Sequence, residues 1–274
     1  MSGKGKNAID MTGGSLWKNI LVFSLPLMMT QMLEVLFNLS DVAIAGKYAD
    51  YIALGAVGST ALLVSLFTGI LIGMGAGVNV RTAHQLGAEK TSGSSETVAR
   101  TVYSGLIVCL IIGIILCLVC NIFARPMLET LKTKDELIES AVLYLKIYAL
   151  GMPAMAVYNF GNGVLSACGE TKKPLVYLSI AGVLNVILNI FFVVVCKKAA
   201  DGVAIASVIA QYLSASMIMC HLLRRKDSCK LWLSNKYFDT SACGGVLMIG
   251  IPTGMQNAIF AVANLFVQTG VNHF

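Results

Sequence analysis

Charged residues are scarce in this sequence. They make up 12% of its 274 residues, whereas hydrophobic residues make up 57%, and the mean hydropathy is +0.77. A soluble domain of this size cannot hide so much apolar side chain in its core, so the composition indicates a polytopic membrane protein. The net charge of +6 does not point to nucleic acid, because the basic residues fall in short loops between apolar runs.

Several chemical motifs are also missing. The three histidines are scattered, and Cys117 and Cys120 lack both a second cysteine pair and a nearby histidine, so we expect no transition-metal site. No phosphate-binding lysine follows the glycines of 69–77, so the sequence does not predict that this chain binds ATP as an energy source. Without a serine turn or paired acids on separate helices, we expect neither an enzyme nor a cofactor. The cysteines are expected to be buried thiols, with Cys229 and, at the margin, Cys243 outside the apolar segments.

Seven apolar runs are each long enough to cross a hydrocarbon core of about 30 Å. They are continuous rather than alternating, so membrane-spanning strands are excluded and an all-α polytopic fold is expected. The first 15 residues are expected to form a cytoplasmic tail that is not cleaved. The expected helices are 17–46, 53–86, 97–123, 137–168, 174–196, 202–223 and 241–272.

The loops carry unequal numbers of lysine and arginine. The side that holds the N-terminus has 13 and the opposite side has 7. This bias places the N-terminus in the cytoplasm, together with the segments 87–96, 169–173 and 224–240. The turn at 169–173 is read as a tight connector, in which Gly169 ends one helix and Pro174 starts the next.

The chain contains a weak internal repeat. A shift of 226 residues lays Pro26 on Pro252 and Met29 on Met255 in register. Six helices separate the two copies, so both enter the membrane from the same side, as in parallel transporter repeats. We expect a six-helix transporter lobe at 16–223, a cytoplasmic linker at 224–240, and the first helix of a second, parallel-repeat lobe at 241–274. Pro26, Pro252 and also Pro153 are candidate hinges or kinks.

A polar stripe marks the first helix. Glu34 and Asp41 are seven residues apart, so at about 100° per residue both acids face one way, with Asn38 and Gln31 beside them. An ionisable group inside a membrane span is costly unless it faces water or a partner, and it is a functional hypothesis by default.

Four segments resemble the multidrug and toxic compound extrusion (MATE) family. They are LPLMMTQMLEVLFNLSDVAIAG at 25–46, GMGAGVNVRTAHQLGAEK at 73–90, YLKIYALGMPAMAVYNFGNGVLSACGETKKP at 144–174 and AGVLNVILN at 181–189. The resemblance implies the first lobe and helix seven of a twelve-helix antiporter. It further implies alternating-access export of lipophilic, often cationic drugs or toxic metabolites in exchange for protons or sodium ions, in the plasma membrane of a prokaryote.

The resemblance also implies site residues. Asp41 corresponds to the acid central to cation coupling, with Asn185, Asn189 and Ser207 as its neighbours. A substrate cleft would be lined by Glu34, Asn38, Gln31, Asn159 and Asn162. Here the chain departs from many relatives, because the position of Asn189 is often an aspartate and that of Glu34 an uncharged amide. No metal is expected beyond a sodium ion at Asp41.

Alternatives remain open from the sequence alone. Asp41 could be an interfacial residue, and Asn185 and Asn189 could simply bond neighbouring helices. A flippase for a lipid-linked substrate shares the two-lobe layout, but a cleft for a large anionic headgroup should carry several lysines or arginines, and only Lys146 and Arg81 come near. The exporter is preferred. Its partners would be small amphiphilic or cationic substrates, membrane lipid and a second lobe from a longer parent, because one lobe alone would expose the polar cleft to lipid.

Overall fold

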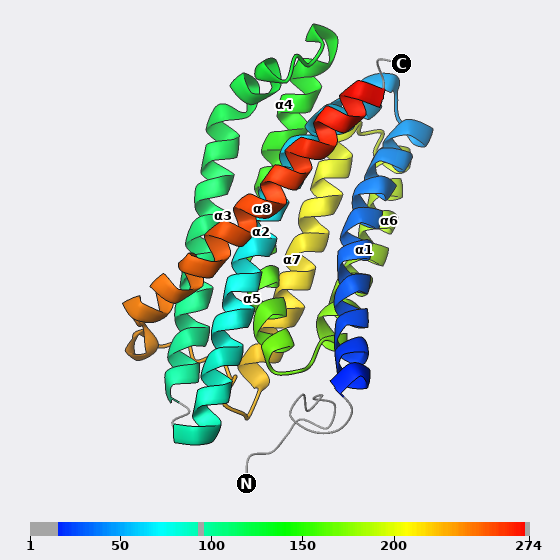
Figure 1. Ribbon diagram of the computed structural model, residues 1–274. Helices are drawn as coiled ribbons and strands as arrows, with labels where there is room; N and C mark the ends of the chain where they lie inside the picture. Colours follow the sequence, from blue (N-terminus) through cyan, green and yellow to red (C-terminus); the bar gives the residue numbers. More distant parts are fainter. Residues whose placement is uncertain (1–15, 93–95, 272–274) are drawn as a thin grey trace.

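The computed structural model describes residues 16–92 and 96–271, and all regular structure within them is helical. Figure 1 shows the helices as one elongated bundle whose members run up and down. The elements are α1 (Leu16–Tyr48), α2 (Tyr51–Ser92), α3 (Glu96–Thr130), α4 (Asp135–Ala149), α5 (Met152–Ala167), α6 (Lys172–Ile190), the π-helical turn η1 (Phe191–Val195), α7 (Ala200–Arg224), the 3₁₀ turn η2 (Asn235–Tyr237) and α8 (Thr240–Val271).

Membrane-spanning helices account for most of these elements. Within the described residues, α1, α2, α3, α6 with η1, and α7 are long and apolar enough to cross a bilayer, and the bent pair α4 and α5 passes the same test together. The protein is therefore an all-α polytopic membrane protein. The start of α1, the α5–α6 turn and the α7–α8 linker (residues 225–239) lie at one end of the bundle (Figure 1). The loop charges predict that this end faces the cytoplasm.

The expected single helix at 137–168 is wrong. The structure breaks it into α4 and α5, which are bent by 44° at Leu150 and Gly151. Pro153 lies in the first turn of α5. Proline has no N–H to donate to a carbonyl of the preceding turn, so the hydrogen-bond ladder of α4 is interrupted here and Pro153 takes a first-turn position of a new helix. Pro26 and Pro252 instead lie inside α1 and α8.

Two other helices differ from the sequence expectation at their ends. α3 continues seven residues beyond the expected 123, past Pro126, to Thr130. Arg125 forms ion pairs with Glu129 and Glu139 there, so a charged extension outside the apolar run stays helical. The helix expected at 174–196 closes with the π-helical turn η1 rather than with α-helix.

α2 is the central helix, and α8, α3, α4 and α5 all pack against it. The glycine stripe on α2 allows this packing: a side chain at Gly73 or Gly77 would overlap with the backbone of α8 around Gly250 and Gly254. The stripe therefore serves close helix contact, as its small residues predict. α1 lies at the edge of the bundle, mainly against α6, and many of its apolar side chains are exposed (Figure 1).

The α5–α6 connection is a tight turn. Gly169 has φ of 79°, in the left-handed region that favours glycine, and its N–H donates to the carbonyl of Ser166 (2.9 Å). The N–H of Glu170 donates to the carbonyl of Leu165 (2.8 Å). These bonds satisfy the last carbonyls of α5 and turn the chain back into the membrane as α6, as predicted for Gly169.

Candidate functional site

A buried polar cluster joins three helices around Asp41. Asn189 on α6 donates its Nδ2 hydrogen to Asp41 Oδ1 (2.6 Å), and Ser207 on α7 donates its hydroxyl hydrogen to Asp41 Oδ2 (2.8 Å). Asn185, one turn before Asn189, donates to Ser207 Oγ (3.1 Å). All four side chains are at most 5% exposed. The cluster therefore holds α1 against α6 and α7 through one carboxylate.

Two side chains of this cluster donate hydrogen bonds to Asp41. Both of its oxygens accept hydrogen bonds, and Ser207 accepts from Asn185 while donating to Asp41. A protonated carboxyl would itself need an acceptor for its O–H, whereas an ionised carboxylate only accepts. The arrangement thus suits an ionised Asp41, and the helices supply the donors that compensate for its burial.

One atom of the cluster has no partner. Asn189 Oδ1 is buried and accepts no hydrogen bond among the described residues, while Asn189 Nδ2 also reaches Asn185 Oδ1 (3.2 Å). A buried carbonyl oxygen without a donor is costly. Together with the oxygens of Asp41, Asn185 and Ser207 it offers an all-oxygen ligand set, which suits a hard monovalent cation or an acceptor for a proton carried by Asp41.

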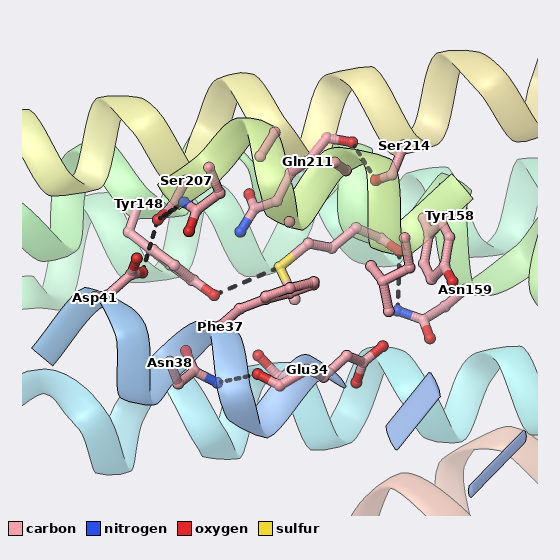
Figure 2. A pocket seen from close by; sticks show the side chains of 17 residues that line it. Glu34, Phe37, Asn38, Asp41, Tyr148, Tyr158, Asn159, Ser207, Gln211 and Ser214 are labelled. Carbon is pink, nitrogen blue, oxygen red and sulfur yellow. Dashed lines mark hydrogen bonds between the residues drawn. The ribbon is translucent and has the colours of Figure 1, made fainter. Parts of the chain in front are cut away.

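The cluster forms one end of a cavity inside the bundle. The cavity has a volume of about 80 Å³, enough for several water molecules. Figure 2 shows Asp41 with Ser207 at one end of it and Glu34 with Tyr158 and Asn159 toward the other. The lining residues come from α1, α2, α4, α5, α6 and α7, so the cavity lies within the first six expected helices.

Glu34 differs from Asp41 in its surroundings. Its side chain lines the cavity and is half-buried, and no hydrogen bond or ion pair to its carboxylate is found among the described residues. Only its backbone carbonyl is engaged, as the acceptor for Asn38 Nδ2 (3.1 Å). The cavity thus contains two different carboxylates: that of Asp41 accepts hydrogen bonds, and that of Glu34 faces open space (Figure 2).

The structure brings together some expected cleft residues and separates others. Asn38 and Asn159 line the cavity with Glu34. Gln31 and Asn162 are not among its lining residues: Gln31 is exposed on α1, and Asn162 accepts a hydrogen bond from Ser166 (3.4 Å) on α5. Their assignment to the substrate cleft stays a prediction.

Sequence reasoning missed many of the cavity residues, among them Phe37, Tyr148 and Gln211. Phe37 lies on α1 between the two acids, three residues after Glu34 and four before Asp41, so helical spacing alone could have placed it on the same face. Tyr148 at the end of α4 donates to Met155 Sδ (3.9 Å), and Gln211 comes from α7. Neither carries a local signal, because only the packing of α4 and α7 brings it to the cavity.

The histidines, cysteines and acids of the described residues form one disulfide and no metal-binding group. No group of three or more His, Cys, Asp or Glu suited to a metal occurs in the part of the chain that the structure describes. The expectation that the cysteines are buried thiols is wrong for Cys168 and Cys229, which form a disulfide. The packing of the α7–α8 linker against the α5–α6 turn brings them together, and sequence spacing carries no sign of it. Cys196 and Cys220 are exposed.

These features define a class of protein: a polytopic helical membrane protein with a carboxylate site buried between its spanning helices. The sequence model of the MatE family matches residues 26–191, and the chain belongs to this family. It is therefore a multi-pass protein of the bacterial plasma membrane.

Individual relatives agree with this assignment. The chain is 26% identical over 269 residues to a probable multidrug resistance protein, YpnP, of Bacillus subtilis, with 97% of this chain and 59% of that protein covered. It is 23% identical over 281 residues to a probable multidrug resistance protein, NorM, of Thermotoga maritima, covering 94% and 56%. The chain thus spans less than two thirds of the length of these relatives.

A solved structure has the same fold. It is an outward-facing multidrug resistance MATE family transporter of the MOP superfamily, which is 22% identical to this chain with a TM-score of 0.84. The match covers 97% of this chain and 58% of that one. The likeness places the described helices in the arrangement of that transporter's corresponding part.

Proposed function

We propose that this chain forms the first lobe of a cation-coupled exporter that exchanges lipophilic cations for protons or sodium ions. The observation that carries the proposal is the buried Asp41, which sits in a membrane cavity with converging donors from two other helices. Such a carboxylate is costly in a purely structural role, whereas a site that alternates between an ion and a substrate needs it. The names of the relatives, multidrug resistance proteins, support the same reading.

The geometry of the cluster supports an exchange mechanism. When a proton binds Asp41, one carboxyl oxygen changes from acceptor to donor, so the Asn189 amide that now donates to it must turn and present its free Oδ1. A sodium ion would make the same demand, because it too requires oxygen rather than N–H from Asn189. Either event repacks the contact between α1 and α6, and α1 lies at the edge of the bundle with many of its side chains exposed, so little packing resists its movement.

Substrate class follows from the rest of the lining. Glu34 supplies a charge without a partner, and Phe37, Tyr148 and Tyr158 supply aromatic faces. This combination attracts organic cations through charge and through the ring faces. A drug-sized molecule needs more room than the described cavity provides, so α1 must move aside for it to enter. Ion entry and substrate entry would then compete through the same helix.

A lipid-linked substrate flippase is less well supported. Two carboxylates and no lysine or arginine line the cavity in the described residues. A large anionic headgroup would be repelled by such a lining. Nothing in the cavity resembles a catalytic constellation either, so transport is the function that the geometry favours.

One face of α1 points to a further partner. Gln31 and Asn38 are exposed there, within a segment that spans the membrane. Polar side chains that face lipid are unfavourable, and those of transporters normally face a cleft. We propose that a second lobe, as in longer relatives, covers this face.

The decisive experiment uses tetraphenylphosphonium as a lipophilic cation and the purified chain in detergent, because all cavity residues lie within it. Calorimetric titration at two pH values, with and without sodium, should show weaker binding when the competing ion is present. Asp41→Asn should remove that dependence, whereas the exposed Asp135→Asn should keep it. Ion dependence that survives in Asp41→Asn overturns the assignment of Asp41. The ion that changes the affinity identifies the coupling ion. Efflux from vesicles of a full-length parent, driven by a pH or a sodium gradient alone, then checks it.

A further inference from the structure

The α7–α8 linker is bonded covalently to the α5–α6 turn. Cys229 in the linker forms a disulfide with Cys168, which directly follows α5, across a sequence separation of 61. Cys229 is 2% exposed, whereas Cys168 is partly exposed. The bond therefore ties together two connecting segments at the same end of the bundle, and Cys168 is the more exposed of the two residues.

Polar contacts surround the bond on both sides. Arg225, the first residue of the linker, forms an ion pair with Glu170 (3.3 Å) in the α5–α6 turn, and Lys173 pairs with the same carboxylate (2.7 Å). Ser228 donates its hydroxyl hydrogen to Glu89 Oε1 (2.6 Å) near the end of α2. These contacts hold the linker near the lobe whether or not the sulfurs are joined, so the two cysteines remain close neighbours in either redox state.

The side of the membrane on which the disulfide lies decides how stable it can be. The excess of lysine and arginine places this face in the cytoplasm. Reduced glutathione and thioredoxin keep thiols reduced there, and cytosolic disulfides are usually transient and redox-sensing. A permanent structural role is therefore a poor explanation for a disulfide at this position.

We propose that Cys168 and Cys229 are a redox-sensing pair whose oxidation by peroxide clamps the α7–α8 linker onto the lobe. The proposal concerns a modification site and holds whether or not the chain transports lipophilic cations. In the reduced state the linker keeps its polar contacts but can open. In the oxidised state it cannot separate from the α5–α6 turn.

Hydrogen peroxide can supply the two-electron oxidation that joins the two thiols. The Cys168 thiolate attacks one peroxide oxygen, the O–O bond breaks, and a sulfenic acid forms while the other oxygen leaves as water after protonation. The Cys229 sulfur then attacks the sulfenic sulfur, so that the S–S bond forms and a second water leaves. A dithiol reductant reverses the change by thiol–disulfide exchange, giving back two thiols and taking the disulfide onto itself. Cys168 is the peroxide-reactive residue because it is the more exposed of the two.

The first test measures the bond. Membranes that contain the chain are equilibrated with dithiothreitol or peroxide, free thiols are blocked, and the peptides that carry Cys168 and Cys229 are quantified by mass spectrometry. Both should be free thiols in reductant and joined after peroxide, and Cys168→Ser should leave Cys229 free throughout. The matched variant Cys196→Ser alters an exposed cysteine and should leave the bond intact. Free thiols after peroxide, or a bond that resists reductant in native membranes, would overturn the proposal.

The second test measures the linker. Lys226 is exposed in it, and trypsin should cleave there severalfold faster in the reduced chain than in the oxidised chain, as read on a reducing gel after thiol blocking. Cys229→Ser should cleave at the fast rate in both conditions. The wild-type comparison does not depend on how that variant folds. Equal cleavage of the reduced and oxidised wild-type chain would show that the bond does not restrain the linker.

The third measurement checks the side of the membrane. Cys196 follows η1 at the opposite end of the bundle from Cys229. A membrane-impermeant maleimide added to reduced intact cells should label Cys196 and spare the pair, and inverted vesicles should give the reverse. Labelling of Cys168 from outside would place the pair away from the cytoplasm and remove the argument for redox sensing.

Discussion

The ring of Phe37 occupies the space that a side chain on Gly182 would need. A Cβ built at Gly182 on α6 would overlap with the ring carbons of Phe37 on α1. Both residues line the cavity, and Phe37 lies between Glu34 and Asp41 along its helix (Figure 2). The absence of a side chain at position 182 thus decides how closely α1 approaches α6 beside the candidate site.

Gly182→Ala should therefore push α1 away from α6. Overpacking of this kind costs about 1–3 kcal/mol, so the thermal unfolding midpoint in detergent should fall. Tetraphenylphosphonium affinity should change as well, because Phe37 is displaced in the cavity. Gly58→Ala is the matched control, since a Cβ there meets open space and alanine favours helix. If both variants unfold alike, the contact between Phe37 and Gly182 does not set the helix spacing.

Asn189→Ala removes one of the two side chains that donate to Asp41. Hydrogen bonds to charged groups contribute roughly 1.5–3 kcal/mol, so the ion dependence of tetraphenylphosphonium binding should weaken by about 10-fold or more. Asn121→Ala on α3 serves as the control, because the Asn121 amide donates to the carbonyl and sulfur of Cys117, away from the cavity. If Asn189→Ala leaves the ion dependence unchanged, Asn189 serves helix packing rather than ion coupling.

Glu34→Gln tests whether the cavity acid meets the substrate. If its charge faces the substrate directly, the variant should lose affinity for tetraphenylphosphonium much more than for a neutral substrate of similar size. Glu129→Gln, an exposed acid on α3, should affect neither. Equal losses for charged and neutral ligands would instead favour Glu34 as a second proton-binding position.

Glu170 predicts a dependence of stability on pH. Burial raises the pKa of its carboxyl, but the contact with Lys173 and the charges of Arg225, Lys173 and His221 outweigh burial and hold the pKa below its ordinary value. Because the pKa of Glu170 is lower in the folded than in the unfolded chain, its charged form stabilises the fold. This stabilisation is complete above the unfolded pKa of about 4.3 and is lost as the pH falls through the folded pKa.

The variant Glu170→Gln should therefore unfold more easily than wild type at neutral pH, by roughly 2 kcal/mol, a value between those of exposed and buried ion pairs. The difference should shrink as the pH falls through the lowered folded pKa of Glu170, because the wild-type carboxyl then becomes neutral as well. Unfolding midpoints measured from pH 3 to 7 give the answer, with the exposed Glu139→Gln for comparison. A difference that is constant with pH would mean that the charge of Glu170 does not contribute.

Much of this fold can be predicted from the sequence, since continuous apolar runs report helices directly. The shared face of Glu34 and Asp41 also follows from helical spacing. The meeting of Asp41 with Asn185, Asn189 and Ser207 came from family resemblance, because no local pattern tells which helices touch. The bend at Leu150 and Gly151 was missed for a related reason: an apolar run through a proline can continue, as in α1, or break, and packing decides which.

The close crossing of α2 and α8 has a consequence for protein engineering. Pro26 and Pro252 mark corresponding points of a sequence duplication, which suggests a division between the two copies in the α7–α8 linker. The structure packs α8 closely against α2 through facing glycines, so a division in the linker would separate two helices that are in close contact. Cutting the chain after Arg224 would leave the backbone of α2 bare along Gly73 and Gly77, in a groove that lipid tails fill poorly. A fragment meant to hold the cavity intact should therefore keep α8.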